Sequence, residues 1–271
     1  MKLAGSTFGY LHHATLDEAI ADLAGHGIDE IELTPMPPHL HPTTCDAYRR
    51  RSLGAHLERH GVSCISVNPG FVDLNLISVN PEFRELSLRQ LETGLELAHD
   101  LHAGRHVVVP GRRHALAPAP ADDARGVLLD GLERLLRTAD ALGVEIELEN
   151  SPYGFLGGAG DLLAIAEEVD HPRLRLCYDV ANGLAQEDPA EGVRRIAPRL
   201  GLVHVSDTWA DRWAHTSVGR GDVDFDAFAA AVADAGYAGP VVYELVDGED
   251  PAPRMADDLR ALAGHGWAVT G

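Results

Sequence analysis

The chain has 271 residues, of which 45% are hydrophobic, and a formal net charge of −20 at pH 7. This charge argues against nucleic acid or an anionic membrane as a partner, since both require a basic surface. Lys2 is the only lysine, which argues against enzymes that need an internal lysine for a Schiff base or a P-loop.

Targeting and redox features point to the cytoplasm. No run approaches 18 consecutive apolar residues, and the first residues lack the apolar core of a signal peptide. The three cysteines are sparse and show no CxxC spacing, which is typical of reduced thiols. We therefore expect a cytoplasmic protein with no membrane association.

Short apolar runs alternate with longer amphipathic stretches along the whole chain. Leu16, Ala19, Ile20 and Leu23 recur at helical spacing, and Thr15 before them suits a helix N-cap. Further helices are expected around residues 88–97, 129–142, 225–236 and 253–263. The apolar runs predict strands near residues 2–6, 28–33, 63–68, 105–109, 144–149, 173–178, 201–205 and 240–245.

Eight strand–helix units in about 250 residues predict an α/β fold, a single (β/α)8 TIM barrel over residues 1–271. A doubly wound sheet is the alternative. The first predicted strand is not followed by G-x-G-x-x-G, which disfavours it.

Four of the last predicted strands carry a polar residue where a buried parallel strand should be apolar. These residues are Glu149, Asp179, His204 and Glu244. Active sites of such barrels gather at the carboxyl ends of the strands, so the four side chains are expected to converge. Three carboxylates and one imidazole form a ligand set for a divalent cation such as Mn²⁺, Mg²⁺, Co²⁺ or Zn²⁺.

Five segments in this order resemble the xylose-isomerase-like barrel superfamily. They read G-V-E-I-E-L-E-N (143–150), C-Y-D-V-A-N (177–182), H-V-S-D (204–207), G-R-G-D-V-D-F (219–225) and Y-E-L (243–245). The superfamily includes sugar isomerases, ketose 3-epimerases, inosose dehydratases and endonuclease IV. The resemblance runs over nearly the whole chain, and its motifs are specific as an ordered set rather than singly.

The resemblance implies one divalent ion, Mn²⁺ first, bound by Glu149, Asp179, His204 and Glu244. Glu149 and Glu244 would also be the catalytic acid/base pair of an epimerase or isomerase. The substrate would be a small sugar, keto-sugar or cyclitol, and the reaction would abstract a proton next to a carbonyl through a metal-stabilised enediolate. Relatives often form dimers or tetramers, so a homo-oligomer is expected.

Further residues match polar positions near the substrate in this superfamily, or suit its pocket. The substrate-binding candidates are Glu32, Asn182, Asp207, His215 and Arg220. An apolar wall against a sugar ring could be formed by Phe8, Tyr153 and Trp209.

Residues that depart from the superfamily's sequence pattern reduce the number of candidate functions. Many relatives have histidine where this chain has Asn182, and the third and fourth predicted strands lack the added zinc-binding histidines of endonuclease IV. A DNA-repair site is therefore not expected. A lyase or dehydratase remains the alternative, because the same proton abstraction followed by loss of a leaving group would use the same site. His215 would then be the general acid.

Alternation of side chains along a strand gives one more expectation. If Glu149 and Asp179 point into the barrel, then Glu147 and Arg175 do so as well, one layer below. We expect Glu147 to pair with Arg175, since an unpaired buried carboxylate is costly. Glu30 would join them by the same alternation from Glu32.

Overall fold

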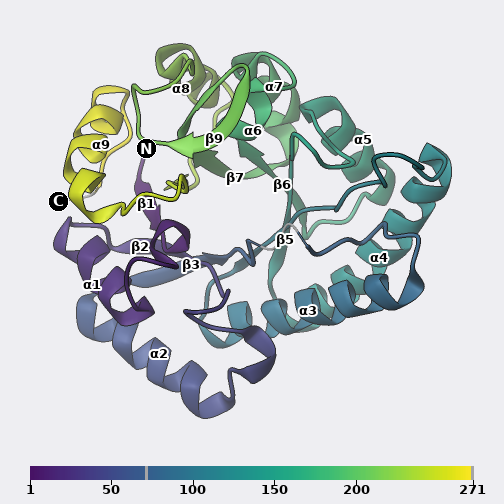
Figure 1. Cartoon of the computed structure of the whole chain (residues 1–271), viewed down its shortest axis with the longest axis horizontal. Helices are drawn as coiled ribbons and strands as arrows, with labels where there is room; N and C mark the ends of the chain where they lie inside the picture. Colours follow the sequence, from purple (N-terminus) through teal and green to yellow (C-terminus); the bar gives the residue numbers. More distant parts are fainter. Residues whose placement is uncertain (71–72, 270–271) are drawn as a thin grey trace.

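The computed structural model describes residues 1–70 and 73–269, which form a closed barrel of eight parallel strands ringed by helices (Figure 1). Around the barrel the strands follow the order β1-β10-β7-β6-β5-β4-β3-β2. Their bounds are β1 Leu3–Ser6, β2 Glu30–Leu33, β3 Ser63–Val67, β4 Arg105–Val108, β5 Glu145–Glu149, β6 Leu174–Asp179, β7 Leu200–Val205 and β10 Val241–Tyr243. Because the sheet closes on itself, the TIM barrel is confirmed and the doubly wound alternative is wrong.

Helices connect successive strands and cover the outside of the barrel (Figure 1). Their bounds are α1 Leu16–Gly25, α2 Ala47–His60, α3 Pro81–Asp100, α4 Ala121–Leu142, α5 Ala159–Val169, α6 Val180–Leu184, α7 Pro189–Ile196, α8 Phe225–Asp234 and α9 Ala252–Gly264. In the described part of the chain, no helix combines the length and apolar character needed to cross a membrane.

Local sequence signals set the helix ends. Thr15 caps α1 as predicted: its side chain accepts the Glu18 backbone N–H, and the Glu18 carboxylate accepts the Thr15 N–H. The helix α4 ends at Gly143, which has a φ of 73°, in the left-handed region that glycine enters without strain.

The apolar core has two parts. A small cluster inside the barrel contains Ala4, Val107, Cys177, Leu202 and Val242. A much larger cluster lies between the strands and the surrounding helices. The small cluster fills the middle of the barrel, so the polar residues at the strand ends lie above a packed floor rather than over a channel.

A two-stranded antiparallel hairpin follows β7 and was not predicted. It consists of β8 Asp207–Trp209 and β9 Arg212–Thr216, and it lies at the carboxyl ends of the barrel strands. His215 in β9 forms a bridge with Val246, so the hairpin is tied to the segment after β10. It therefore folds back toward the strand ends that carry the polar residues.

Glu147 is fully buried inside the barrel, and its partner differs from the one expected. The β5–β6 register places Glu147 opposite Arg175, but the Arg175 Nη2 donates to the Leu200 carbonyl at 2.9 Å. The ion pair of Glu147 is with Arg105 Nε at 3.6 Å, from β4. The expected Glu147–Arg175 pair is therefore wrong, because β5 has two neighbours and the arginine of the other one reaches the carboxylate.

Glu30 was also expected to join this layer. It instead forms an ion pair with Lys2 Nζ at 2.9 Å, at the amino-terminal end of the barrel. Its side chain is partly exposed, so water and Lys2 stabilise the charge there.

Burial raises the pKa of Glu147 to about 8, although Arg105 opposes this. At pH 9, where the carboxylate is charged, Arg105→Met is expected to destabilise the fold by about 3 kcal/mol, because it removes the ion-pair partner. Arg175→Met should cost less, since it removes a hydrogen bond to a carbonyl. Urea denaturation at pH 9 measures both free energies of unfolding. As a control, Glu147→Gln/Arg105→Met should recover part of the loss. A larger loss for Arg175→Met than for Arg105→Met would contradict the assignment.

His106 on β4 is a second buried polar side chain with an unusual environment. It packs against Gly94 of α3, where any side chain would collide with the imidazole. Neither ring nitrogen has a hydrogen-bond partner among the described residues. Burial lowers the pKa of His106 to about 4, so the imidazole stays neutral in the folded chain.

The pKa of His106 predicts a contribution to acid lability. The unfolded chain binds a proton below pH ~6.5 and the folded chain only near pH 4, so the stability from this residue falls as the pH drops through this range. Over the whole range, His106 lowers the free energy of unfolding by about 3 kcal/mol. His106→Leu should remove it, seen as a smaller difference between free energies of unfolding at pH 7.5 and pH 4.5. Equal differences in the two proteins would refute the prediction.

Candidate metal centre and adjoining cavity

The four predicted ligand residues converge at one end of the barrel. Glu149 ends β5, Asp179 ends β6, His204 lies in β7 and Glu244 follows β10. These strands are consecutive in the barrel order, and the register places Asp179 directly beside His204. All four side chains are buried.

The distances within this group suit a common ion. The Nδ1 atom of His204 lies 3.1 Å from Glu149 Oε1, 3.9 Å from Asp179 Oδ2 and 3.9 Å from Glu244 Oε2. One ligand atom from each of the four residues lies within 4.8 Å of the others. Ligands bound to one ion at about 2.1 Å are separated by about 3–4 Å, so small side-chain shifts would complete the coordination.

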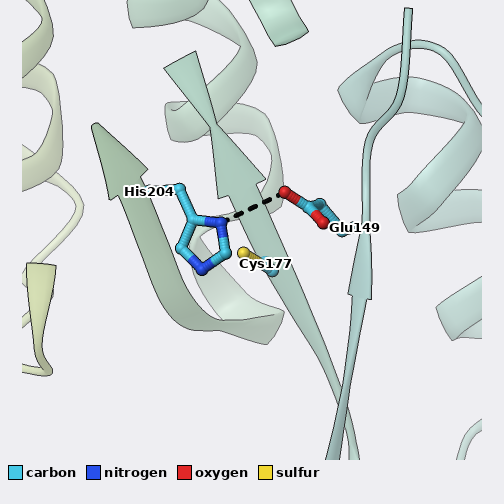
Figure 2. A group of neighbouring side chains, drawn as sticks. All are labelled: Glu149, Cys177 and His204. Carbon is cyan, nitrogen blue, oxygen red and sulfur yellow. Dashed lines mark hydrogen bonds and ion pairs between the residues drawn. The ribbon is translucent and has the colours of Figure 1, made fainter. Parts of the chain in front are cut away.

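Figure 2 shows Glu149 and His204 facing each other from β5 and β7, with the thiol of Cys177 beside them. Cys177 lies on β6 directly opposite Glu149 and belongs to the apolar cluster inside the barrel. Burial raises the pKa of its thiol well above the usual value, so it is a neutral neighbour of the group.

The second ring nitrogen of His204, Nε2, contacts another carboxylate. Glu32 on β2 is fully buried, and its Oε2 lies 3.1 Å from His204 Nε2. A metal-bound histidine usually donates its other ring N–H to such a group, which holds the ring in one orientation. Glu32 was predicted to bind substrate, and the structure instead places it behind the imidazole.

Asn68 connects this carboxylate with another member of the group, and sequence reasoning missed it. Its Nδ2 donates to Glu32 Oε1 at 3.1 Å and to Glu244 Oε1 at 3.0 Å. Ser66 Oγ donates to Glu32 Oε2 at 2.7 Å. Asn68 directly follows β3, so the rule that located Glu149 and Asp179 also applied to it.

Asparagines position the Asp179 carboxylate. Asp179 Oδ1 accepts the backbone N–H of Asn182 at 2.6 Å and thereby caps α6. Asn150 Oδ1 accepts the backbone N–H of Asp179 at 2.8 Å. Asp179 Oδ2 is buried and has no hydrogen-bond partner among the described residues. One oxygen is thus held by the helix end, and the other points into the group.

The local charges explain the titration behaviour of the group. Burial raises the pKa of Glu149, although the hydrogen bond with His204 opposes this, and burial raises the pKa of Glu244 well above its usual value. Burial opposes the charged form of His204, yet the carboxylates around it, Glu32 and Glu244, raise its pKa well above the usual value. Positive charge is therefore strongly favoured at this point.

One feature of these residues, independent of any family resemblance, supports a divalent ion at this point. A buried oxygen normally accepts a hydrogen bond, but Asp179 Oδ2 has no such partner among the described residues. It faces the same point as His204 Nδ1. Oxygen ligands with one imidazole suit hard or borderline cations. The described residues thus include a cluster that could hold a metal ion.

A cavity of about 230 Å³ opens beside this group. Glu149 and Glu244 contribute to its wall, together with Asn182 and His215 of the predicted substrate residues. His215 Nδ1 lies 3.3 Å from Glu244 Oε2 and 3.1 Å from Ser206 Oγ. Burial lowers the pKa of His215, which favours a neutral imidazole.

Two aromatic residues contribute to the remaining wall. Phe8 borders the cavity as expected, and Trp213 of β9, which sequence reasoning missed, borders it as well. Tyr153 stands edge-on to Trp213, with ring centroids 5.4 Å apart. Trp209 is not among the cavity-lining residues, and its face is covered by the Arg212 guanidinium.

Two predicted substrate residues lie outside the cavity. Arg220 is exposed, and its Nη1 donates to Glu249 Oε2 at 3.3 Å. The Asp207 carboxylate accepts backbone N–H groups from Gly219 and Gly221, each at 2.8 Å. Asp207 therefore holds the loop after the hairpin in place.

A parallel barrel with this cluster at its strand ends defines a TIM-barrel protein with a candidate metal centre and an adjoining cavity. The chain matches the family described as the xylose isomerase-like TIM barrel over residues 20–265, and it belongs to that family.

Curated relatives match part of the chain. The L-ribulose 3-epimerase of Methylomonas sp. (strain DH-1) is 27% identical over 147 residues, which cover 52% of this chain and 50% of that protein. The L-ribulose-5-phosphate 3-epimerase UlaE of Salmonella paratyphi C (strain RKS4594) is 27% identical over 142 residues, which cover 50% and 49%. The chain thus spans about half the length of these relatives.

Solved structures match over almost the whole chain. A D-tagatose 3-epimerase-like protein has a TM-score of 0.85 at 22% identity, covering 98% of this chain and 97% of that one. The 3-keto-D-glucoside 4-epimerase YcjR of E. coli has a TM-score of 0.82 at 22% identity, covering 97% and 99%. At this identity the likeness shows the fold.

Glu32→Gln is expected to lower the affinity for Mn²⁺ about 10- to 100-fold, because the carboxylate that orients His204 is lost. Titration of the metal-free protein by calorimetry measures the dissociation constant. Glu30→Gln on the same strand is the matched control and should bind as the wild type does, while His204→Ala should lose the ion. Unchanged affinity in Glu32→Gln would contradict the role assigned to Glu32.

Proposed function

We propose that this chain is a metal-dependent epimerase or isomerase of a small sugar, keto-sugar or cyclitol. The observation that carries the proposal is that Glu149 and Glu244 border one cavity while belonging to one group of potential ligands. In the barrel order, β6 and β7 separate the strands of these two glutamates. A substrate in the cavity would therefore meet one carboxylate on each side.

The bound ion would be held by Glu149, Asp179, His204 and Glu244, with Mn²⁺ as the first candidate and Mg²⁺, Co²⁺ or Zn²⁺ as alternatives. As a Lewis acid it would polarise a carbonyl oxygen and lower the energy of the negative charge that develops there. Glu32 and Asn68 keep His204 and Glu244 oriented through their hydrogen bonds.

The chain's own carboxylates would move the proton. One glutamate removes the proton from the carbon next to the carbonyl, which leaves a planar enediolate, and the other returns a proton to the opposite face. Return to the same carbon inverts its configuration, and return to the neighbouring carbon isomerises the sugar. Each carboxylate accepts a proton in its charged form and donates it once protonated, so the two glutamates can exchange the roles of base and acid.

Other cavity residues would bind substrate hydroxyls. His215 and Asn182 present polar atoms to the cavity, and Phe8 offers an apolar surface. The epimerase names of the relatives over half of their length, and of the structural neighbours, support the same reaction class.

Isotope exchange in D₂O tests the proposal. Enzyme loaded with Mn²⁺ is incubated with keto-sugars such as L-ribulose and D-fructose, and deuterium next to the carbonyl is measured by NMR. Glu149→Gln and Glu244→Gln should each lower the rate of exchange at least about 100-fold, because each removes one proton carrier. Glu145→Gln, on the same strand as Glu149, is the matched control.

The products separate the two candidate reactions. Deuterium incorporation with an unchanged molecular formula supports an epimerase or isomerase. Loss of water or another group would show the lyase reaction, in which His215 beside Glu244 is the candidate acid. Only the protonated imidazole can donate the proton, and the lowered pKa of His215 disfavours that form. Absence of exchange with every sugar tested would overturn both.

A further inference from the structure

The residues at the mouth of the cavity differ in kind from those in its interior. With about 230 Å³, the cavity is smaller than the roughly 300–1,000 Å³ of typical small-molecule sites. A reacting sugar unit would fill it, and any group attached to that unit would lie at the mouth. Trp213, which lines the cavity, is 37% exposed, and Tyr153 beside it is 65% exposed.

Trp213 is held in a defined orientation. Its Nε1 donates to Asn182 Oδ1 at 2.7 Å, and Asn182 Nδ2 donates to the Asn150 carbonyl at 3.0 Å. The backbone N–H of Asn182 is bonded to Asp179. The indole is thus connected to a candidate metal ligand through a single residue, so its position relative to the reacting unit is preset.

The two tryptophans of the hairpin are in different environments. The Arg212 guanidinium lies over the ring of Trp209, 3.7 Å from its centroid. Trp213 instead makes edge contacts, with Tyr153 at 5.4 Å and with His215 at 5.6 Å between centroids. An aromatic ring presented at a mouth in this way suits the C–H face of a sugar ring.

The charge around the cavity disfavours an anionic ligand. Glu32, Glu149, Asp179 and Glu244 supply four carboxyl groups, which when ionised carry more negative charge than one divalent ion compensates. A phosphate would add to this charge. Among the described residues that line the cavity, none is arginine or lysine.

Three arginines in the neighbouring loops make contacts of their own. Arg220 donates to Glu249, and Arg254 donates to both oxygens of Asp247 at 2.7 and 2.8 Å. Arg113 donates to the Ala119 carbonyl. None of these three arginines lines the cavity.

We propose that the substrate is an uncharged glycoside whose reacting sugar unit carries a keto group. This unit occupies the cavity, while the attached ring or chain packs on Trp213 and Tyr153. Trp213 is the residue that determines this specificity. The inference rests on the proposed function only in placing the reacting unit beside Glu149 and Glu244.

Binding measured without turnover tests this inference. The full chain loaded with Mn²⁺ is titrated by calorimetry with sugars that lack the keto group and therefore serve as non-reacting probes: D-glucose, D-glucose 6-phosphate, methyl β-D-glucopyranoside, cellobiose and sucrose. At least one glycoside should bind at least tenfold more tightly than D-glucose, and the phosphate should bind more weakly than D-glucose. Trp213→Ala should weaken the glycoside at least tenfold and D-glucose less than threefold.

Trp209→Ala is the matched control, because it removes the same residue type from the same hairpin outside the cavity. Circular dichroism and Mn²⁺ content establish that each variant is folded and loaded, and Trp213→Phe should retain part of the preference. A phosphate that binds best, no glycoside preference, or a preference untouched by Trp213→Ala would overturn the inference. Glycoside preference without isotope exchange would overturn the proposed reaction alone.

Discussion

The position of the His204 imidazole is the constraint on which the rest of the site depends. The ring lies between two buried carboxylates, Glu149 on one side and Glu32 on the other, each 3.1 Å from a ring nitrogen. An imidazole in the middle of an apolar strand is costly without partners. Here both nitrogens are engaged, so the ring has one orientation, and Nδ1 faces the point shared by the candidate ligands.

The closed barrel makes this arrangement possible. Parallel strands in register place their carboxyl ends on one rim, so residues distant in sequence become neighbours, as with Asp179 beside His204. The packed cluster of Ala4, Val107 and Val242 lies below and keeps water from the floor. Charged groups on this rim interact strongly because the surroundings are apolar, which accounts for the raised pKa values of Glu149 and Glu244.

Sequence patterns predicted the barrel strands to within a few residues, because buried parallel strands are short apolar runs with a strong period. They also located Glu149, Asp179, His204 and Glu244, since a polar residue at the end of such a run is conspicuous. The hairpin of β8 and β9 was missed: its strands have only three and five residues and contain no apolar run like those of the barrel strands.

The sequence also left open which residue each buried charged side chain contacts. Alternation correctly placed Glu147 inside the barrel, yet it could not decide between arginines on the two neighbouring strands. Glu32 was recognised as a site residue, but its role depends on which ring nitrogen of His204 it meets. Which partner a buried side chain contacts depends on distances across the barrel, and a sequence pattern does not contain these distances.

The site therefore consists of two parts with different structural origins. The candidate metal ligands belong to the barrel rim, where register and packing leave little freedom. The wall that would meet the substrate belongs to loops, and the hairpin carrying Trp213 and His215 is anchored by Asp207 at its start and by the bridge to Val246. Substitutions between these anchors would alter the cavity mouth without moving Glu149 or Glu244. A barrel built in this way can keep one proton-transfer chemistry while its loops select different sugars.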